Sequence, residues 1–452
     1  MTLHQMTAVQ AADAIRQGDI TSEQLVRSCL DRIGEFEETV QAWTYLDPEY
    51  ALRQAKQADL ARKSGFPLGP LHGVPVGIKD IFDTQDMPTE DGTVLHAGRQ
   101  PTEDCTVVAL LRQAGAVIMG KTVTTELAVY SPGKTKNPHN PEHTPGGSSS
   151  GSAAAVASFM VPLAVGSQTN GSMIRPASYC GVVGYKPSHG LVSRHGVLRQ
   201  SPPLDTIGVF GRTVGDVALI AQVLMAYDSN DKAMRPSARP TLLETAAAEP
   251  PVDPDFAFVK SPVWDQADED LRGAFEELAE HLGERVEEVT LSETFDYAHG
   301  WQKTIMLADL AKNFMVDELK GRDKISKVLC EMLDEGKEYK AVAYNEAVEH
   351  IDVLNNLLAE VFEKFNAIIT PATTGEAPKG LDATGSPTFC TLWTYCGMPA
   401  VTIPVMQGSN GLPVGVQIVG PKGDDARVLQ CARWLMESLA PEDLAEENMA
   451  EE

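Results

Sequence analysis

The sequence predicts an α/β fold in which a mixed, mainly parallel β-sheet is flanked by helices and carries a helical insertion. After Leu71, short apolar runs separated by glycine and proline alternate with helical segments, as in layered α/β proteins. A charged and largely helical stretch, 295–365, interrupts this alternation. Strand texture then returns at Ala367, and Asn410-Gly411 between two apolar runs is a strong hairpin signal. One domain that spans residues 1–452 follows from this order.

The N-terminal part, 1–65, reads as helices that pack on the rest of the domain. Thr21 and Gln24 have the spacing of a capping box, and the residues that follow form an apolar stripe at helical spacing. Asp47-Pro48 starts another helix, which ends at Gly65.

The next part, 66–228, is the expected catalytic core. Its four strand candidates are Val74 to Lys79, Ala116 to Met119, Leu163 to Val165 and Gly181 to Tyr185. Its helix candidates include Thr106 to Ala114 and Val214 to Tyr227.

The remaining chain divides into three parts. Residues 229–365 begin with a loop rich in Pro, Ala, Ser and Thr and continue as the helical insertion, which we expect to cover the site. Residues 366–440 complete the sheet with strands at Ala400 to Val405 and Val414 to Val419. The acidic end, 441–452, reads as a solvated tail.

Composition limits the partners and the compartment. No apolar run reaches the roughly 18–20 residues that span a bilayer, and the first residues lack the pattern of a secretory signal. The net charge of -26 disfavours a polyanionic partner such as nucleic acid. The seven scattered cysteines fit free thiols in a reducing cytoplasm.

The stretch 146–187 carries the chemistry. It opens with GGSSSG, a turn that crowds hydroxyl groups next to flexible backbone, and an alanine-rich helix follows from Ser152 to Phe159. A second glycine and serine loop, GSQTNGS at 166–172, lies beyond a short apolar run. The apolar residues between the loops argue against a flexible linker.

This stretch resembles the signature of the amidase signature family of serine hydrolases, and GVPVGIKD at 73–80 resembles its lysine motif. The resemblance implies the amidase-signature fold and an acyl-enzyme mechanism. It implies that Ser172 is the nucleophile, that Ser148 follows a cis peptide bond and relays the proton, and that Lys79 is the base. The oxyanion hole would consist of backbone N–H groups in the loop Thr169, Asn170, Gly171 and Ser172.

Two features test this interpretation. Lys79 must lose its proton to act as a base, so burial has to lower its pKa from about 10.4, while the neighbouring Asp80 opposes this unless it points elsewhere. The loop also departs from the common pattern: Gln168 replaces an aspartate, Asn170 replaces a glycine, and Arg175 is displaced by one position. Backbone donors survive these changes.

Rival motifs are weaker. GAVIMGKT at 115–122 matches a phosphate-loop pattern, but its middle residues are apolar and strand-like, which makes the match fortuitous. His139 and His143 have no third ligand at a recognisable spacing. We therefore expect neither a metal nor a cofactor.

The leading hypothesis is an amidohydrolase that cleaves the C–N bond of a small-molecule amide, anilide, urea or hydrazide. We expect it to act without nucleic acid or membrane, and a homodimer is left open. The first alternative is the glutaminase component of a tRNA-dependent amidotransferase, its A subunit, and the second is a catalytically silent binding protein. Tyr130 and Trp393 either line the substrate pocket or belong to the core.

Overall fold

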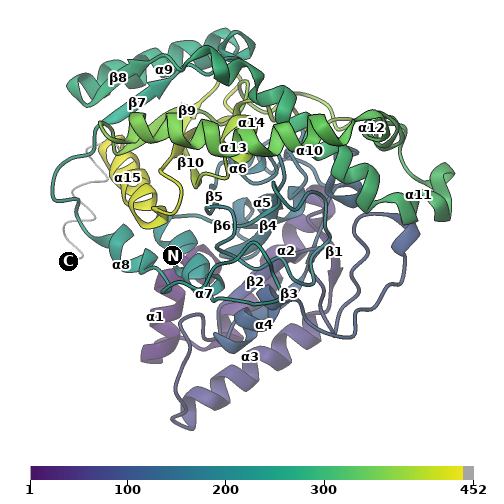
Figure 1. Ribbon diagram of the computed structural model, residues 1–452. Coiled ribbons are helices and arrows are strands. Elements are labelled where there is room, and N and C mark those ends of the chain that lie inside the picture. Colours follow the sequence, from purple (N-terminus) through teal and green to yellow (C-terminus); the bar gives the residue numbers. More distant parts are fainter. Residues whose placement is uncertain (1, 441–452) are drawn as a thin grey trace.

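One twisted sheet of eleven strands organises the molecule (Figure 1). The computed structural model describes residues 2–440, so the tail predicted at 441–452 lies outside the described residues. Across the sheet the order is β1-β3-β2-β4-β6-β5-β10-β11-β9-β7-β8. The strands are β1 Trp43–Leu46, β2 Pro75–Lys79, β3 Val117–Thr122, β4 Leu163–Gln168, β5 Val183–Lys186, β6 Thr206–Gly211, β7 Phe256–Val259, β8 Val286–Val289, β9 Ala367–Pro371, β10 Ala400–Gln407 and β11 Pro413–Val419.

The sheet is mixed. β2 pairs in parallel with β3 and β4, and β7 pairs in parallel with β8 and β9. The strands between them pair antiparallel, including the hairpin of β10 and β11 that Asn410-Gly411 predicts. The predicted fold class, a mixed sheet flanked by helices, is confirmed. Strands β1, β6 and β8 were not predicted.

Helices cover both faces of the sheet. Among residues 2–440, no helix has the length and hydropathy needed to cross a bilayer. The helices are α1 Ala8–Gln17, α2 Ser22–Val40, α3 Pro48–Lys63, α4 Thr106–Gln113, α5 Ser150–Ala157, α6 Ile174–Cys180, α7 Val214–Leu224, α8 Leu242–Ala247, α9 Glu269–Leu282, α10 Ala298–Asn313, α11 Met315–Gly321, α12 Lys327–Glu338, α13 Ala341–Phe362, α14 Thr388–Tyr395 and α15 Asp425–Ser438.

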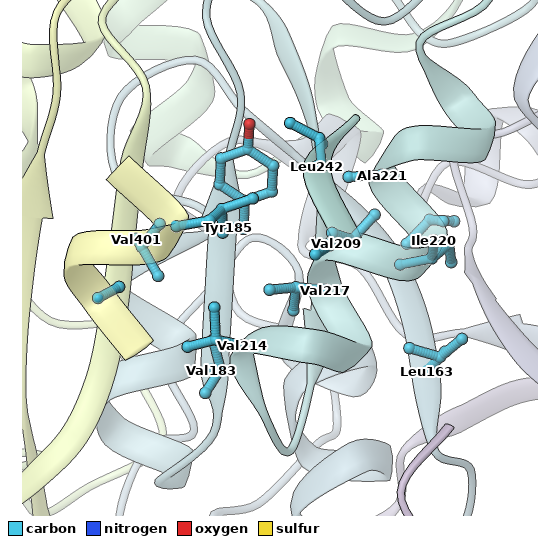
Figure 2. Packing of buried hydrophobic residues seen from close by; sticks show 14 of the residues in the cluster. Leu163, Val183, Tyr185, Val209, Val214, Val217, Ile220, Ala221, Leu242 and Val401 are labelled. Atoms are coloured by element: carbon cyan, nitrogen blue, oxygen red, sulfur yellow. The ribbon is translucent and has the colours of Figure 1, made fainter. Parts of the chain in front are cut away.

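Strand alternation separates two apolar layers. Leu163 and Val165 of β4 face a core shared with α4, α7, α8 and α15, whereas Ala164 faces a core shared with α2, α5 and α6. Figure 2 shows the first of these cores, in which Val217 and Ile220 of α7 lie over strands β4, β5 and β6. The sheet is therefore buried on both faces at β2 and β4.

The helical insertion lies on the side of the sheet that α5 and α6 cover. α10 packs on α12, α13 and α14, and together they bury Ile305, Leu310, Leu354 and Leu358. In Figure 1 the green helices of this region run across the upper half of the molecule, below α9 and above α5 and α6. This places the insertion beside the loops that connect β4 to α6.

Candidate active site

Lys79 is the last residue of β2 and points to the face of the sheet that α5 and α6 cover. Val76 and Ile78 of the same strand point to the opposite core, as the period of two requires. The Lys79 side chain is completely buried. Its Nζ donates to Ser148 Oγ at 2.8 Å and to Ser167 Oγ at 2.9 Å. The contact with Ser148 agrees with the expected relay, whereas the contact with Ser167 is additional.

The surroundings of Lys79 favour its neutral form. Burial lowers the pKa of Lys79 well below its ordinary value, because removal from water penalises the charged amine. The charge of Asp205 acts in the opposite direction and raises this pKa. Within residues 2–440, no carboxylate lies within ion-pair distance of the Lys79 nitrogen, so desolvation dominates.

Asp80 does not oppose this effect, because the structure pairs it with a different lysine. Asp80 Oδ1 lies 3.0 Å from Lys121 Nζ, and both side chains are buried. Lys121 also donates to Thr89 Oγ1 at 2.6 Å. Lys121 belongs to the phosphate-loop-like segment, which forms β3 and therefore presents no open loop to a phosphate.

The loop that carries Ser148 packs directly on α6. Gly146 has a φ of +80°, and a Cβ atom there would lie 2.8 Å from Cα of Pro176. The Gly147–Ser148 peptide bond is cis, as the family resemblance implies. The displaced Arg175 is fully buried and donates to the carbonyl of Gly147 at 2.5 Å and to that of Gly385 at 2.6 Å. Arg175 therefore fixes the serine loop against α6.

The loop after β4 presents unused backbone donors. Over residues 2–440, the N–H groups of Asn170, Gly171 and Ser172 donate to no backbone or side-chain acceptor. The carbonyl of Asn170 accepts from Thr394 Oγ1 at 2.5 Å, which fixes one peptide plane of the loop. Three successive free N–H groups in a mostly buried loop can stabilise an oxyanion.

Gln168 explains how the loop tolerates the loss of the usual aspartate. Its Oε1 accepts from the N–H groups of Met173 at 2.7 Å and Ile174 at 3.0 Å, at the start of α6. Its Nε2 donates to Thr394 Oγ1 at 2.8 Å. One amide side chain thus ties both ends of the loop to the helix and to α14.

Ser172 lies in the same loop and keeps some access to solvent. The residue is 9% exposed, and its hydroxyl makes no hydrogen bond with the part of the chain that the structure describes. The structure therefore joins Lys79 to Ser148 but shows no hydrogen bond between Ser148 and Ser172. The Lys79 amine, the Ser148 hydroxyl and the free N–H groups form a site suited to nucleophilic attack on a carbonyl group.

A cavity of about 500 Å³ opens beside this loop, toward the helical insertion. Tyr130 and Asn170 line it from the catalytic core, and Met306 and Met332 line it from α10 and α12. Tyr130 accepts a hydrogen bond from Asn170 Nδ2 at 3.0 Å. Trp393, the other aromatic candidate, is fully buried in the core around α10 and α14 and does not line this cavity.

A second cavity, of about 360 Å³, reaches the site from the other side of the loop. Ser167, Thr169 and Asp205 line its inner part. Ser167 and Asp205 are functional candidates that sequence reasoning missed, because the resemblance assigns roles only to residues inside its motifs. The signal that could have found Ser167 is its place at the end of β4, beside the end of β2 that carries Lys79.

The chain belongs to the amidase family, since the family model described as Amidase matches residues 24–429. It is accordingly an amidase, an enzyme that acts on carbon–nitrogen bonds other than peptide bonds.

Relatives and solved structures sharpen this assignment. The A subunit of glutamyl-tRNA(Gln) amidotransferase from Natranaerobius thermophilus is 32% identical over 97% of this chain and 96% of its own length. Its counterpart from Syntrophus aciditrophicus is 32% identical over 96% and 97%. Native peptide amidase from Stenotrophomonas maltophilia superposes with a TM-score of 0.82 at 27% identity, over 95% of this chain and 96% of that one. A chain from a vestigial complex linked to the origins of an s-triazine catabolic enzyme gives a TM-score of 0.89 at 25% identity, over 96% and 98%.

These relatives contradict the expected partners. We expected a small-molecule amide as the partner, with no role for nucleic acid, but the two amidotransferase relatives carry tRNA in their names and are subunits of an assembly. The expectation failed because it rested on the net charge of -26. Net charge describes one chain alone, and in an assembly another subunit can supply the basic surface that nucleic acid needs.

Proposed function

We propose that this chain is the glutaminase subunit of a tRNA-dependent amidotransferase. The full-length similarity to the A subunits of two amidotransferases supports this role over that of a free-standing amidase. In this proposal the chain releases ammonia from the side-chain amide of glutamine, and a partner subunit uses the ammonia on tRNA-bound glutamate. The cytoplasm is the proposed compartment, and the free thiols of the described residues suit its reducing conditions.

The proposed mechanism begins with a proton transfer. Ser172 Oγ attacks the amide carbonyl carbon while its proton passes to Ser148, and the Ser148 proton passes to the neutral amine of Lys79. The observation that carries this proposal is the 2.8 Å contact between Lys79 and Ser148, in a buried setting without an acidic partner at the lysine. The resting hydroxyl of Ser172 has to turn toward Ser148 for the relay to close.

The remaining steps use the same groups. The developing oxyanion accepts from N–H groups of the loop formed by Thr169, Asn170, Gly171 and Ser172, where one donor typically contributes about 2.7–4 kcal/mol. The proton returns from Lys79 through Ser148 to the departing nitrogen, the C–N bond breaks, and ammonia leaves an acyl-Ser172 ester. Water then attacks this ester and gives its proton to the same relay, which frees the acid and restores Ser172.

Reconstitution tests the proposal. The chain is assayed alone and together with the other subunits of the amidotransferase, with glutamine and glutamyl-tRNA(Gln) as substrates. We expect ammonia release and formation of glutaminyl-tRNA(Gln) in the assembled enzyme, and loss of both with Ser172→Ala. Full amidase activity of the chain alone, with no transfer to tRNA in any assembly, would contradict the amidotransferase role while leaving the amidase assignment intact.

A further inference from the structure

Asp205 is a half-buried carboxyl group that the proposed mechanism does not use. It lies in the segment between β5 and β6 and lines the 360 Å³ cavity. Its Oδ1 lies 2.6 Å from the hydroxyl of Thr169, the first residue of the loop proposed to bind the oxyanion. Its Oδ2 accepts from the backbone N–H groups of Gln200 at 3.0 Å and Ser201 at 2.9 Å.

The hydrogen bonds around Thr169 fix the position of a proton. The Thr169 hydroxyl also lies 2.6 Å from Oε1 of Gln200, and this oxygen cannot donate. The orientation of the Gln200 amide follows from its Nε2, which donates to the carbonyl of Leu127 at 2.9 Å. A hydroxyl carries a single proton, so it can donate to only one of its two oxygen neighbours.

All of these contacts are satisfied when Asp205 is a neutral acid. Oδ1 then donates its proton to Thr169, Thr169 donates to Gln200, and the carbonyl oxygen Oδ2 accepts the two backbone N–H groups. An ionised Asp205 would leave Thr169 between two acceptors at 2.6 Å each. Desolvation acts in the same direction, since it raises the pKa of Asp205 above the usual value for an aspartate.

We infer that Asp205 is a positioning residue that acts in its protonated form. The inference rests on the proposed function of the Thr169 to Ser172 loop. The neutral acid holds Thr169, and through it the loop, in place. It also withholds a negative charge from Lys79, because a carboxylate at Asp205 raises the pKa of Lys79 and favours its inactive, charged form.

Arg194 is a further charged group that faces Asp205. Arg194 donates to the backbone carbonyl of Asp205 at 3.2 Å, and its positive charge lowers the Asp205 pKa. Asp231 largely neutralises Arg194 through two contacts of 2.7 Å. Asp205 thus interacts electrostatically with two basic side chains, Lys79 and Arg194, and only Lys79 takes part in the proposed relay.

The test measures how fast a fluorophosphonate probe labels the nucleophile as a function of pH, so it needs neither a known amide nor the rest of an assembly. Asparagine reproduces the neutral acid, since its Nδ2 can donate to Thr169 while its Oδ1 accepts the two backbone N–H groups. We expect Asp205→Asn to keep the plateau labelling rate within about threefold and Asp205→Ala to lose about tenfold or more. We also expect Asp205→Asn to leave the pH of the rise in rate unchanged, because the amide, like the neutral acid, puts no negative charge beside Lys79.

The control is Asp228→Asn, which changes another carboxylate that accepts from hydroxyls, those of Thr106 and Ser193, and does not touch the catalytic loop. It should leave the pH profile unchanged. The inference is wrong if Asp205→Asn is as slow as Asp205→Ala at every pH, or if its rise in rate moves to lower pH, since that shift would mean that wild-type Asp205 carries a negative charge. If the alanine variant fails to fold, as judged by its unfolding transition, the profiles of Asp205→Asn and wild type still decide. Amidotransferase activity is measured in a separate assay. If the chain proves not to be an amidotransferase subunit, the labelling profiles still test the role of Asp205.

Discussion

Replacement of Lys79 by methionine should slow catalysis strongly without lowering the stability of the fold. Methionine keeps the side chain as far as Cε but lacks the amine that touches Ser148 and Ser167. Loss of a general base typically slows a reaction about 10²- to 10⁴-fold, which corresponds to about 2.7–5.4 kcal/mol in the activation barrier. We expect a loss of this size in fluorophosphonate labelling and in ammonia release from glutamine by the assembled enzyme.

The same variant, Lys79→Met, should be at least as stable as the wild type although it is less active. The Lys79 nitrogen contacts only hydroxyl groups and lies in a fully buried site, so its charged form is costly in the folded state. The pKa of Lys79 is lower in the folded protein than in the unfolded chain, where it is about 10.4. Between these two pKa values the folded protein binds fewer protons than the unfolded chain. The free energy of unfolding of the wild type therefore rises with pH across this window. Lys79→Met removes this dependence.

Urea unfolding at several pH values measures the effect. Lys79→Met should be at least as stable as wild type, with its advantage largest below the folded-state pKa of Lys79 and smallest near about pH 10.4, the reference value for lysine. A variant that is less stable than wild type by more than about 1 kcal/mol, or that retains wild-type labelling, would refute the assignment of Lys79 as a buried, neutral base.

Three further substitutions probe the residues around the relay. Lys121→Met should lower the free energy of unfolding by about 3–5 kcal/mol, because it leaves Asp80 buried without its cation. Adding Asp80→Asn should restore most of this loss. If the losses of the two single variants simply add in the double variant, the pairing is contradicted. Gln168→Ala should cost about 2 kcal/mol or more in urea unfolding, since two buried N–H groups at the start of α6 lose their acceptor. Tyr130→Phe should slow labelling about two- to tenfold through Asn170 without changing stability, and an unchanged rate would remove Tyr130 from the site.

The sequence predicted the architecture where its patterns were strong. Alternating apolar and helical segments predicted β2 through β5, and Asn410-Gly411 predicted the hairpin of β10 and β11. It did not predict β8, because the sequence VEEV is half charged and pairs only at the edge of the sheet. β1 is four residues long, and β6 contains glycines that weaken a strand signal.

In the site, too, the sequence motifs predicted some residues, whereas others depend on how distant segments pair. The resemblance named Lys79 and Ser148, and in the structure their side chains lie 2.8 Å apart. The oxyanion hole at Thr169 to Ser172 stays a prediction. Asp80 could not be placed from the sequence, because its partner Lys121 depends on the register between β2 and β3. Asp205 could not be placed either, since its link to Thr169 depends on the antiparallel register between β4 and β6.

The central claim is that a lysine-activated relay makes Ser172 the nucleophile. Peptide mapping after reaction with a fluorophosphonate tests it most directly. The account predicts a single adduct on Ser172, formed slowly in Lys79→Met and absent in Ser172→Ala. An adduct on Ser148 or elsewhere, undiminished labelling of Ser172→Ala, or no adduct on the wild-type enzyme at any pH at which it stays folded would contradict it.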